Sequence, residues 1–446
     1  MKGEGSVFVN KSLKDSLTIG LALFATFFGA GNLIFPPDLG LESGSNWLSA
    51  VLGLLFSGIL IPILGVIVVS YTGGSIIKLT KPIGDNFHKW FILAITLFLS
   101  LVAIPRTGAV ATEMGIQAIF PKIPTVVPVI LFFAITCYFA NDKSNVIDKI
   151  GNILTPMLGI ILLVIVLKGI MTPIASPVET HLKNPFSTAF IGGYQTGDLL
   201  ASFMIATIFL SDIVHKGYTS DKARNKITLN AAIIALLGLL IVYGGLLYIG
   251  ATGSGIFPQG TERVELLLGL VTMILGRVGV VGLAIAVLLA CLTTSIGLTS
   301  SVADYFNELS DNKISYKTFV RIICILGILI ALLGVEKIIF ITNPVFVVLY
   351  PISIVILLLG LFHKYIPNHG SYKGAVFFTF IISVAEALLS IGVKSTLLSN
   401  LISMIPFSSQ GFEWILPAIL GFISGSLVFK EKSKTKEESK TKEEYI

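Results

Sequence analysis

The sequence predicts an all-α polytopic membrane protein, and three observations lead to this prediction. Of its 446 residues, 54% are hydrophobic and only 13% are charged. The mean hydropathy is +0.90, which excludes a soluble globule with a polar surface. Apolar runs of about 20 residues, the length that crosses the hydrocarbon core of a bilayer, recur along the chain between Leu17 and Phe429. We therefore expect a multi-pass protein of the lipid bilayer with twelve transmembrane helices.

The apolar runs define the spans and their flanking segments. The twelve spans are 17–40, 47–71, 90–119, 126–140, 150–171, 189–214, 227–249, 278–303, 319–335, 338–362, 375–391 and 415–429. A polar cytoplasmic segment, 1–16, precedes the transmembrane domain, 17–429. The tail, 430–446, contains SKTKEE twice. We expect this tail to be disordered, because a charged low-complexity stretch has no core to bury.

The basic residues predict the orientation. Of 31 Lys and Arg, 23 fall at the two ends or in every second loop, seven fall in the other loops, and Arg106 lies inside a span. Because cytoplasmic loops carry the excess of basic residues, we expect both termini in the cytoplasm of a bacterial-type plasma membrane. This topology explains the net charge of +6, so we expect no nucleic-acid partner, and no obligatory protein partner is evident.

The first span contains the stretch FFGAGNLIFPP, residues 27–37, in which glycines, an asparagine and two prolines interrupt a hydrophobic run. These residue types break helices. An unbroken helix satisfies its own backbone groups in lipid, so a break near the middle of a span frees carbonyls and amides to bind something.

The sixth span carries a second interruption, GGYQTGDLLAS, residues 192–202. Asp198 could cap the half-helix that follows, or it could face a bound ammonium or cation, and the two roles are compatible. Each interrupted span is the first of a five-helix set, and the two sets run in opposite directions. This arrangement predicts an inverted 5+5 repeat, 17–171 and 189–362, with the binding site at the breaks and two further helices in 375–429.

Two further spans carry polar groups at membrane depth. In the third span, Arg106 is either a gate or substrate-path residue or a snorkelling or structurally paired cation. Glu113 lies two turns away, too far to pair with it directly without flexing. The eighth span ends in a hydroxyl-rich run. Most of these hydroxyls are expected to bond to the preceding helical turn, but the adjacent Thr299 and Ser300 could join freed carbonyls in an all-oxygen site for Na⁺.

The stretches FFGAGNLIFPP and AIPRTGAVATEMG, together with the run ending in GLTSS, resemble the branched-chain amino acid:cation symporter family. The resemblance covers residues 17–429. This family is part of the amino acid/polyamine/organocation superfamily, so the resemblance implies a leucine-transporter-like fold.

The resemblance also implies a set of site residues. Na⁺ would be held by three carbonyls and two hydroxyls, those of Ala25, Phe28, Ile296, Thr299 and Ser300. The substrate carboxylate would meet backbone amides of Ala30, Gly31 and Asn32. The ammonium would meet carbonyls or side chains of Tyr194, Gln195, Thr196 and Asp198.

The sequence departs from its relatives at two points. No asparagine lies well inside the seventh span, so the pattern for a second Na⁺ is missing. Leu33, Ile34 and Phe35 stand where relatives have an arginine. An ionic outer gate would therefore need an arginine from another span, which is Arg106 of the third span. Glu113 is the other gate candidate.

These residues predict an importer of L-leucine, L-isoleucine and L-valine, coupled to Na⁺ as the transported ion and working by alternating access around the two breaks. A proton-coupled importer is the alternative, with Asp198, Glu113 or Glu386 as proton carrier. A membrane-bound sensor or enzyme is the third. All five histidines fall in loops or at span ends, which argues against an intramembrane hydrolase.

Overall fold

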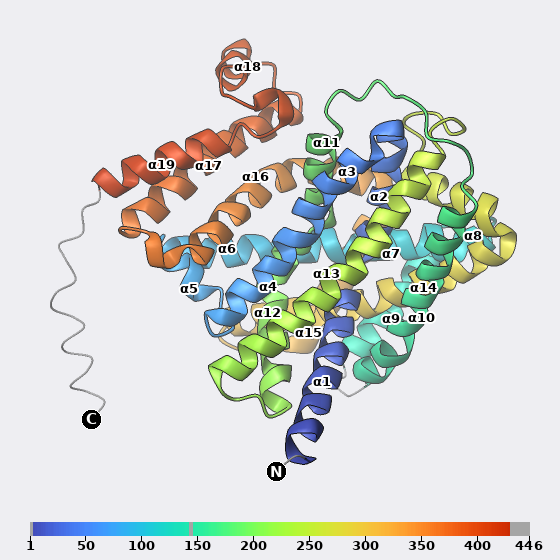
Figure 1. Cartoon of the computed structure of the whole chain (residues 1–446), viewed down its shortest axis with the longest axis horizontal. Helices are drawn as coiled ribbons and strands as arrows, with labels where there is room; N and C mark the ends of the chain where they lie inside the picture. Colours follow the sequence, from blue (N-terminus) through green and yellow to red (C-terminus); the bar gives the residue numbers. More distant parts are fainter. Residues whose placement is uncertain (1–2, 142–145, 429–446) are drawn as a thin grey trace. The chain divides into compact units, whose positions relative to one another are not determined.

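The computed structural model describes residues 3–141 and 146–428, and Figure 1 shows its helices. Within these residues every regular element is helical, with short 3₁₀ and π segments between α-helices. The all-α prediction is therefore confirmed. The prediction of a disordered tail, 430–446, lies outside the described residues. The described residues divide into two compact units, one within 1–74 and 92–346 and the other within 75–91 and 347–428.

The first two predicted spans form one run of helical segments in the first unit. The first span consists of α1 (Gly3–Phe27) and α2 (Ala30–Ser43). The second consists of α3 (Trp47–Leu54), a π segment η2 (Leu55–Leu60) and α4 (Ile61–Tyr71), after the 3₁₀ turn η1 (Gly44–Asn46). Because α1 begins at Gly3, the polar lead-in is part of the first helix.

The third predicted span is a helix interrupted twice by π turns. It comprises α6 (Asp85–Phe98), η3 (Leu99–Ala103), α7 (Ile104–Val110), η4 (Ala111–Ile116) and α8 (Gln117–Ile119). Pro105 stands in the first turn of α7. A proline lacks the amide that would continue the ladder of hydrogen bonds, and π turns are one way in which a helix absorbs such a gap.

The remaining helices of the first unit follow the predicted spans. They are α9 (Val126–Asn141), α10 (Val146–Met171), α11 (Pro185–Gly192), η5 (Gly193–Thr196), α12 (Asp198–His215), α13 (Asp221–Thr252), α14 (Arg263–Leu309), α15 (Tyr316–Ala331) and α16 (Val335–Leu361), the last of which continues into the second unit. Ser220 and Ser315 cap α13 and α15 by accepting backbone amides with their side chains. A bend at Gly276, with φ of 62°, divides α14.

Two interrupted helices pack against other helices of the first unit. The first, α1 with α2, packs against α13, and the second, α11 with α12, packs against α3 and α4. Glycines allow these close contacts: a methyl group at Gly40 of α2 would collide with the Leu247 carbonyl of α13, and one at Gly53 of α3 with the Phe186 carbonyl of α11.

The second unit contains α5 (Ile77–Thr80), the ends of α6 and α16, η6 (His363–Tyr365), α17 (His369–Ser390), α18 (Thr396–Ser403), η7 (Ser408–Gln410) and α19 (Ile415–Val428). Asn368 caps α17 by accepting the Ser371 amide. The helices α17 and α19 pack closely, and a methyl group at Gly374 would collide with the Gly421 carbonyl.

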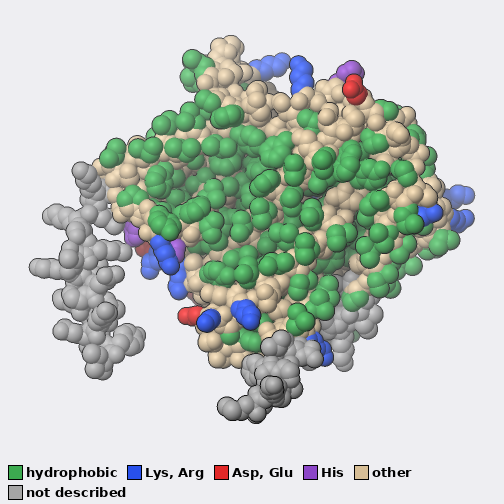
Figure 2. All heavy atoms as spheres, viewed as in Figure 1, with side chains coloured by type: hydrophobic (Ala, Val, Ile, Leu, Met, Phe, Trp, Pro, Cys, Tyr) green, Lys and Arg blue, Asp and Glu red, His purple; other side chains and the backbone are tan. Residues whose placement is uncertain are grey.

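The exposed surface is that of a membrane protein. In the described residues, seven helical segments are long and apolar enough to span a bilayer, and the shorter helices Val126–Asn141, Pro156–Met171 and Ile415–Val428 are also apolar. Large hydrophobic side chains such as Ile160, Leu329 and Phe377 are exposed. Figure 2 shows hydrophobic side chains over most of the visible face, with few charged ones. The protein is therefore a multi-pass membrane protein, and the count of twelve crossings stays a prediction.

Candidate functional site

The first span is interrupted at Phe28 and Gly29, as the glycine-rich stretch predicts. Helix α1 ends at Phe27, and the Phe28 amide donates to the carbonyls of Phe24 and Ala25. Gly29 is extended, with φ of −101° and ψ of −175°, and α2 then starts at Ala30 without a side-chain cap. The expectation that Pro36 and Pro37 also break the helix is wrong, because both lie inside α2.

The second interruption lies between α11 and α12. The chain passes through the 3₁₀ turn η5 and then through Gly197, whose φ of 77° is left-handed. Glycine adopts this conformation without steric cost. The side chain of Asp198 does not cap α12, because α12 begins at Asp198 itself and its N-cap residue is Gly197. The capping interpretation of Asp198 is therefore wrong.

A buried polar cluster joins the two interruptions. Asn32 Nδ2 donates to Asp198 Oδ2 at 2.8 Å, and it also contacts the Phe27 carbonyl and the Tyr243 hydroxyl. The Tyr243 hydroxyl lies 3.5 Å from both the Phe27 carbonyl and Asp198 Oδ2. All the side chains of this cluster are buried. The cluster therefore connects the end of α1, the start of α2, the start of α12 and α13.

Arg106, from α7, lies beside the same interruptions. Its guanidinium donates from Nη1 to the Gln195 carbonyl at 2.6 Å and from Nη2 to the Thr196 carbonyl at 3.1 Å. A Cβ built on Gly31 would be 3.0 Å from Nη2, so the guanidinium packs on the first turn of α2. The rings of Phe35 and Phe346 lie 5.9 and 6.0 Å from Cζ.

The neighbouring residues of η5 carry further polar groups. Gln195 Nε2 donates to Asn343 Oδ1 of α16 at 2.6 Å, and Gln195 Oε1 is buried without a hydrogen-bond partner among the described residues. The Thr196 hydroxyl donates to the Gly193 carbonyl at 2.9 Å. Tyr194 is buried, with its ring 5.8 Å from that of Phe190.

The hydroxyl-rich stretch of α14 divides into bonded and unbonded groups. The hydroxyls of Thr293 and Ser301 donate to carbonyls of the preceding turn, as expected for most of this run. Thr299 is fully buried, and its hydroxyl has no hydrogen-bond partner in the described residues. Within these residues no hydrogen bond joins Thr299 or Ser300 to Ala25 or Phe28, and Ile296 is buried beside them on α14.

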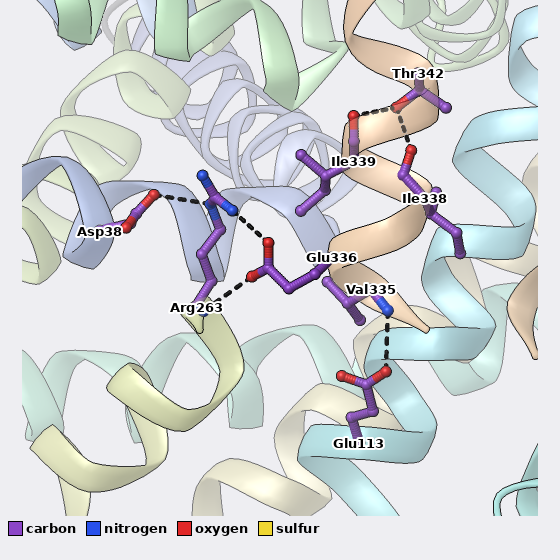
Figure 3. Close-up of polar contacts among 8 residues, drawn as sticks. All are labelled: Asp38, Glu113, Arg263, Val335, Glu336, Ile338, Ile339 and Thr342. Atoms are coloured by element: carbon purple, nitrogen blue, oxygen red, sulfur yellow. Dashed lines mark hydrogen bonds and ion pairs between the residues drawn. The ribbon is translucent and has the colours of Figure 1, made fainter. Parts of the chain in front are cut away.

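An ionic cluster lies one turn further along α2, and Figure 3 shows it in close-up. Arg263, at the start of α14, forms ion pairs with Asp38 of α2 and Glu336 of α16, at 2.8 and 2.5 Å. Its backbone amide also donates to Glu336 Oε1 at 3.0 Å. Arg263 Cζ lies 5.4 Å from the Phe35 ring. One phenylalanine ring thus contacts two guanidinium groups, those of Arg106 and Arg263.

This cluster changes the assignment of the two gate candidates. Arg106 contacts main-chain carbonyls in the site, whereas Glu113 accepts the Val335 amide at 2.9 Å and so caps the start of α16. The ion pairs of this cluster come from Arg263, and the role of Arg106 and Glu113 as gate residues stays a prediction. Sequence reasoning missed Arg263 because it is 225 residues away from Asp38 in the chain.

A comparison with known protein families identifies the chain. The family described as "Branched-chain amino acid transport protein" matches residues 12–432. The chain belongs to this family. The resemblance that the glycine-rich first span and the GLTSS run predict is therefore confirmed.

Two curated members of the family are similar along almost the whole chain. The branched-chain amino acid permease BraB of Bacillus subtilis is 35% identical over 427 residues, covering 93% of this chain and 95% of BraB. The branched-chain amino acid transport system 2 carrier protein of Pseudomonas aeruginosa is 30% identical over 416 residues, covering 92% of this chain and 94% of the carrier.

Solved transporters share the fold at low identity. MhsT in complex with L-phenylalanine has a TM-score of 0.57 and 18% identity, covering 92% of this chain and 98% of MhsT. A Na⁺-coupled sialic acid symporter in a substrate-bound outward-open state has a TM-score of 0.59 and 15% identity, covering 94% of this chain and 91% of the symporter. The family member described here therefore has the fold of these transporters.

Proposed function

We propose that this protein is a Na⁺-coupled symporter that imports L-leucine, L-isoleucine and L-valine by alternating access around its two interrupted helices. The family to which the chain belongs supports the substrate class. The buried hydrogen bond between Asn32 and Asp198, which joins the two interruptions, is the observation that carries the mechanism. It supports a single site at which main-chain groups of both helices are available to a zwitterion.

The surroundings of the interruptions suit an amino acid with an apolar side chain. The rings of Phe98 and Phe346 lie 4.9 Å apart, and a Cβ on Gly197 would be 3.4 Å from the Phe98 ring. Phe35 completes an aromatic wall beside Arg106. Apolar contacts with aromatic rings gain roughly 1–3 kcal/mol for each methylene of a bound substrate, which favours leucine, isoleucine and valine over smaller amino acids.

The proposed Na⁺ site lies at the α1 break and in the C-terminal part of α14. Its ligands would be the carbonyls of Ala25, Phe28 and Ile296 and the hydroxyls of Thr299 and Ser300. The buried Thr299 hydroxyl has no hydrogen-bond partner in the described residues, and a buried hydroxyl without a partner is costly. A hard cation that accepts oxygen ligands would satisfy it.

A proton could replace Na⁺ as the coupling ion, and Asp198 is the residue that favours this second candidate. Its carboxylate is buried between the two interruptions and bonded to Asn32. Uptake of labelled L-isoleucine into proteoliposomes at constant pH, with Na⁺ or K⁺ outside, separates the two. Uptake that requires Na⁺ supports the symporter, and uptake that follows an imposed pH gradient without Na⁺ contradicts it.

The double variant Thr299→Ala with Ser300→Ala tests the ion site. We expect uptake of L-isoleucine to become independent of the Na⁺ gradient, because two of the proposed oxygen ligands are lost. Thr293→Ala is the matched control, since that hydroxyl bonds to the Ala290 carbonyl of its own helix, and we expect it to retain Na⁺ dependence. A double variant with unchanged Na⁺ dependence in proteoliposomes would show that these hydroxyls do not bind the ion.

A further inference from the structure

Arg106 is a buried cation that forms no ion pair with any of the described residues. Arg106 has only 4% of its surface exposed. The partners of its guanidinium are two main-chain carbonyls, of Gln195 and Thr196, and two aromatic rings. Among the described residues no carboxylate lies within ion-pair distance of Arg106. Asp198 is close enough to interact electrostatically, but its Oδ2 is bonded to Asn32.

The helix beside Arg106 adds to the positive potential. The guanidinium packs on Gly31, in the first turn of α2, where the helix dipole is positive; the Asn32 amide of this turn donates to the Gly29 carbonyl at 3.2 Å. This turn has no side-chain cap. Two positive groups that are buried side by side are stabilised by an anion between them, and a guanidinium matches a carboxylate with two parallel hydrogen bonds.

We propose that Arg106 binds the carboxylate of the transported amino acid and thereby selects zwitterionic substrates. This inference rests on the proposed transport of branched-chain amino acids, and it assigns the substrate-recognition role to a side chain in addition to the α2 amides. Arg106 is then a residue of the binding site, and the outer ion pairs belong to Arg263.

An acceptor for the ammonium lies within reach of the same position. The carboxylate and ammonium of an amino acid share one Cα atom, so their two receptors must be neighbours. Gln195 Oε1 is buried and without a hydrogen-bond partner in the described part of the chain, and the Gln195 main-chain oxygen is 2.6 Å from Arg106 Nη1. Gln195 Oε1 would therefore accept a proton of the substrate ammonium.

The contact between Arg106 and the substrate carboxylate is tested by comparing two ligands on the unmodified protein and on its variants. L-Leucine is compared with L-leucinamide, which keeps the ammonium and side chain but has no carboxylate, by competition against labelled L-leucine on the purified full-length protein in Na⁺ gluconate. Removing one partner of a buried charge pair typically weakens binding about 100-fold or more. We therefore expect Arg106→Gln to weaken L-leucine binding by about that factor and to change L-leucinamide binding less than about threefold.

Arg263→Gln is the matched control, because its guanidinium also contacts Phe35 but belongs to the outer cluster. We expect Arg263→Gln to leave the ratio of the two affinities as in the unmodified protein. The inference is overturned if Arg106→Gln weakens both ligands equally, which is the result of a structural role, or if it weakens neither. A requirement for chloride in L-leucine binding would also overturn it, because chloride would then be the anion at Arg106.

Two further measurements keep the outcome decisive. If Arg106→Gln is not monodisperse after purification, Arg106→Lys serves instead, because it keeps the charge and loses the two-pronged geometry, and the affinity ratio should fall about tenfold or more. Failure of the unmodified protein to bind L-leucine would refute the proposed function. Binding of L-leucine by the unmodified protein with an unchanged ratio in the Arg106 variants would refute only the inference.

Discussion

At the scale of single residues, Gly29 at the first interruption and Gly31 in the first turn of α2 have different surroundings. A Cβ on Gly29 would have no atom within 4 Å, whereas one on Gly31 would be 3.0 Å from Arg106 Nη2. Gly29 has φ of −101°, which any L residue adopts. Space beside the guanidinium therefore constrains position 31, and neither space nor backbone conformation constrains position 29.

Gly31→Ala should raise the KM for L-leucine uptake about tenfold, because overpacking costs about 1–3 kcal/mol and the methyl group would displace the Arg106 guanidinium. Alanine favours a helix over glycine by about 1 kcal/mol, so α2 itself should not unfold. Gly29→Ala should stay within about twofold of the unmodified protein. Initial rates of uptake in proteoliposomes measure both. Equal KM values for the two variants would contradict a role for the space at Gly31.

The sequence predicted the breaks at this scale but not the partners of the charged residues. Gly29 and Gly197 lie at the breaks, whereas Gly31, which the sequence also presents as a helix breaker, lies inside α2. The acceptors of Arg106 are main-chain carbonyls of the η5 turn. Every residue has such a carbonyl, so the residue types do not show which carbonyls will accept a hydrogen bond. Asp198 likewise reads as a cap from its position after Gly197, whereas its carboxylate bonds to Asn32, 166 residues earlier.

At the scale of helices, the prolines of the first span did not mark a helix end as expected. Pro36 and Pro37 lie inside α2, where each removes one helical hydrogen bond. Their helix nevertheless continues, because α2 packs along α13: a methyl group at Gly250 would collide with the Pro37 carbonyl. Packing between helices overrides local propensity, and the single sequence does not reveal which helices are neighbours.

The helix pair of the second unit contains two neighbouring acids. Glu413, in the loop before α19, is 4% exposed. Burial and then the negative charge of Glu386 on α17 raise the pKa of Glu413 to about 7 from 4.5. Because the folded state holds this proton more tightly than the unfolded state, the group costs no stability below about pH 4.5. The cost grows as the pH rises towards 7 and is constant above it.

Glu413→Gln should therefore raise the thermal unfolding midpoint at pH 8 and leave it almost unchanged at pH 5, because the glutamine cannot ionise. Unfolding of the detergent-solubilised protein, followed by intrinsic fluorescence at both values, measures the difference. Glu308→Gln, an exposed acid at the end of α14, is the control and should have no effect at either pH. A Glu413→Gln shift of equal size at pH 5 and pH 8 would argue for a packing effect rather than a buried charge.

At the scale of the molecule, the packing of the first unit supports the proposed inverted repeat. The first interrupted helix packs against α13, which is the seventh predicted span, and the other against α3 and α4, the second predicted span. In the proposed repeat, the first span corresponds to the sixth and the second span to the seventh. The contact between the first and seventh spans is therefore equivalent to the contact between the sixth and second spans. The sequence predicts the inverted repeat from the positions of the two breaks. The helix contacts are a separate observation that supports the same repeat.

The ion pairs of Arg263 link α2, α14 and α16 on the proposed external side of the site, and Phe35 lies buried between them and Arg106. In the proposed import cycle, substrate from outside passes this cluster, so we expect the cluster to open in the outward-facing state. Loss of Arg263 removes both ion pairs and should shift the population towards that state.

Arg263→Gln should thus increase the rate at which a membrane-impermeant maleimide modifies Phe35→Cys in intact cells, in a background with the three native cysteines replaced. The increase should be several-fold, because losing two partly exposed ion pairs removes about 1 kcal/mol or somewhat more. Lys337→Gln is the control, since Lys337 is exposed on the same turn of α16 as Glu336. The rate at which Phe35→Cys is modified in this variant should match the rate in the Phe35→Cys protein alone. Slower labelling in Arg263→Gln would place the cluster in the outward-facing state instead, because its ion pairs would then hold the pathway open.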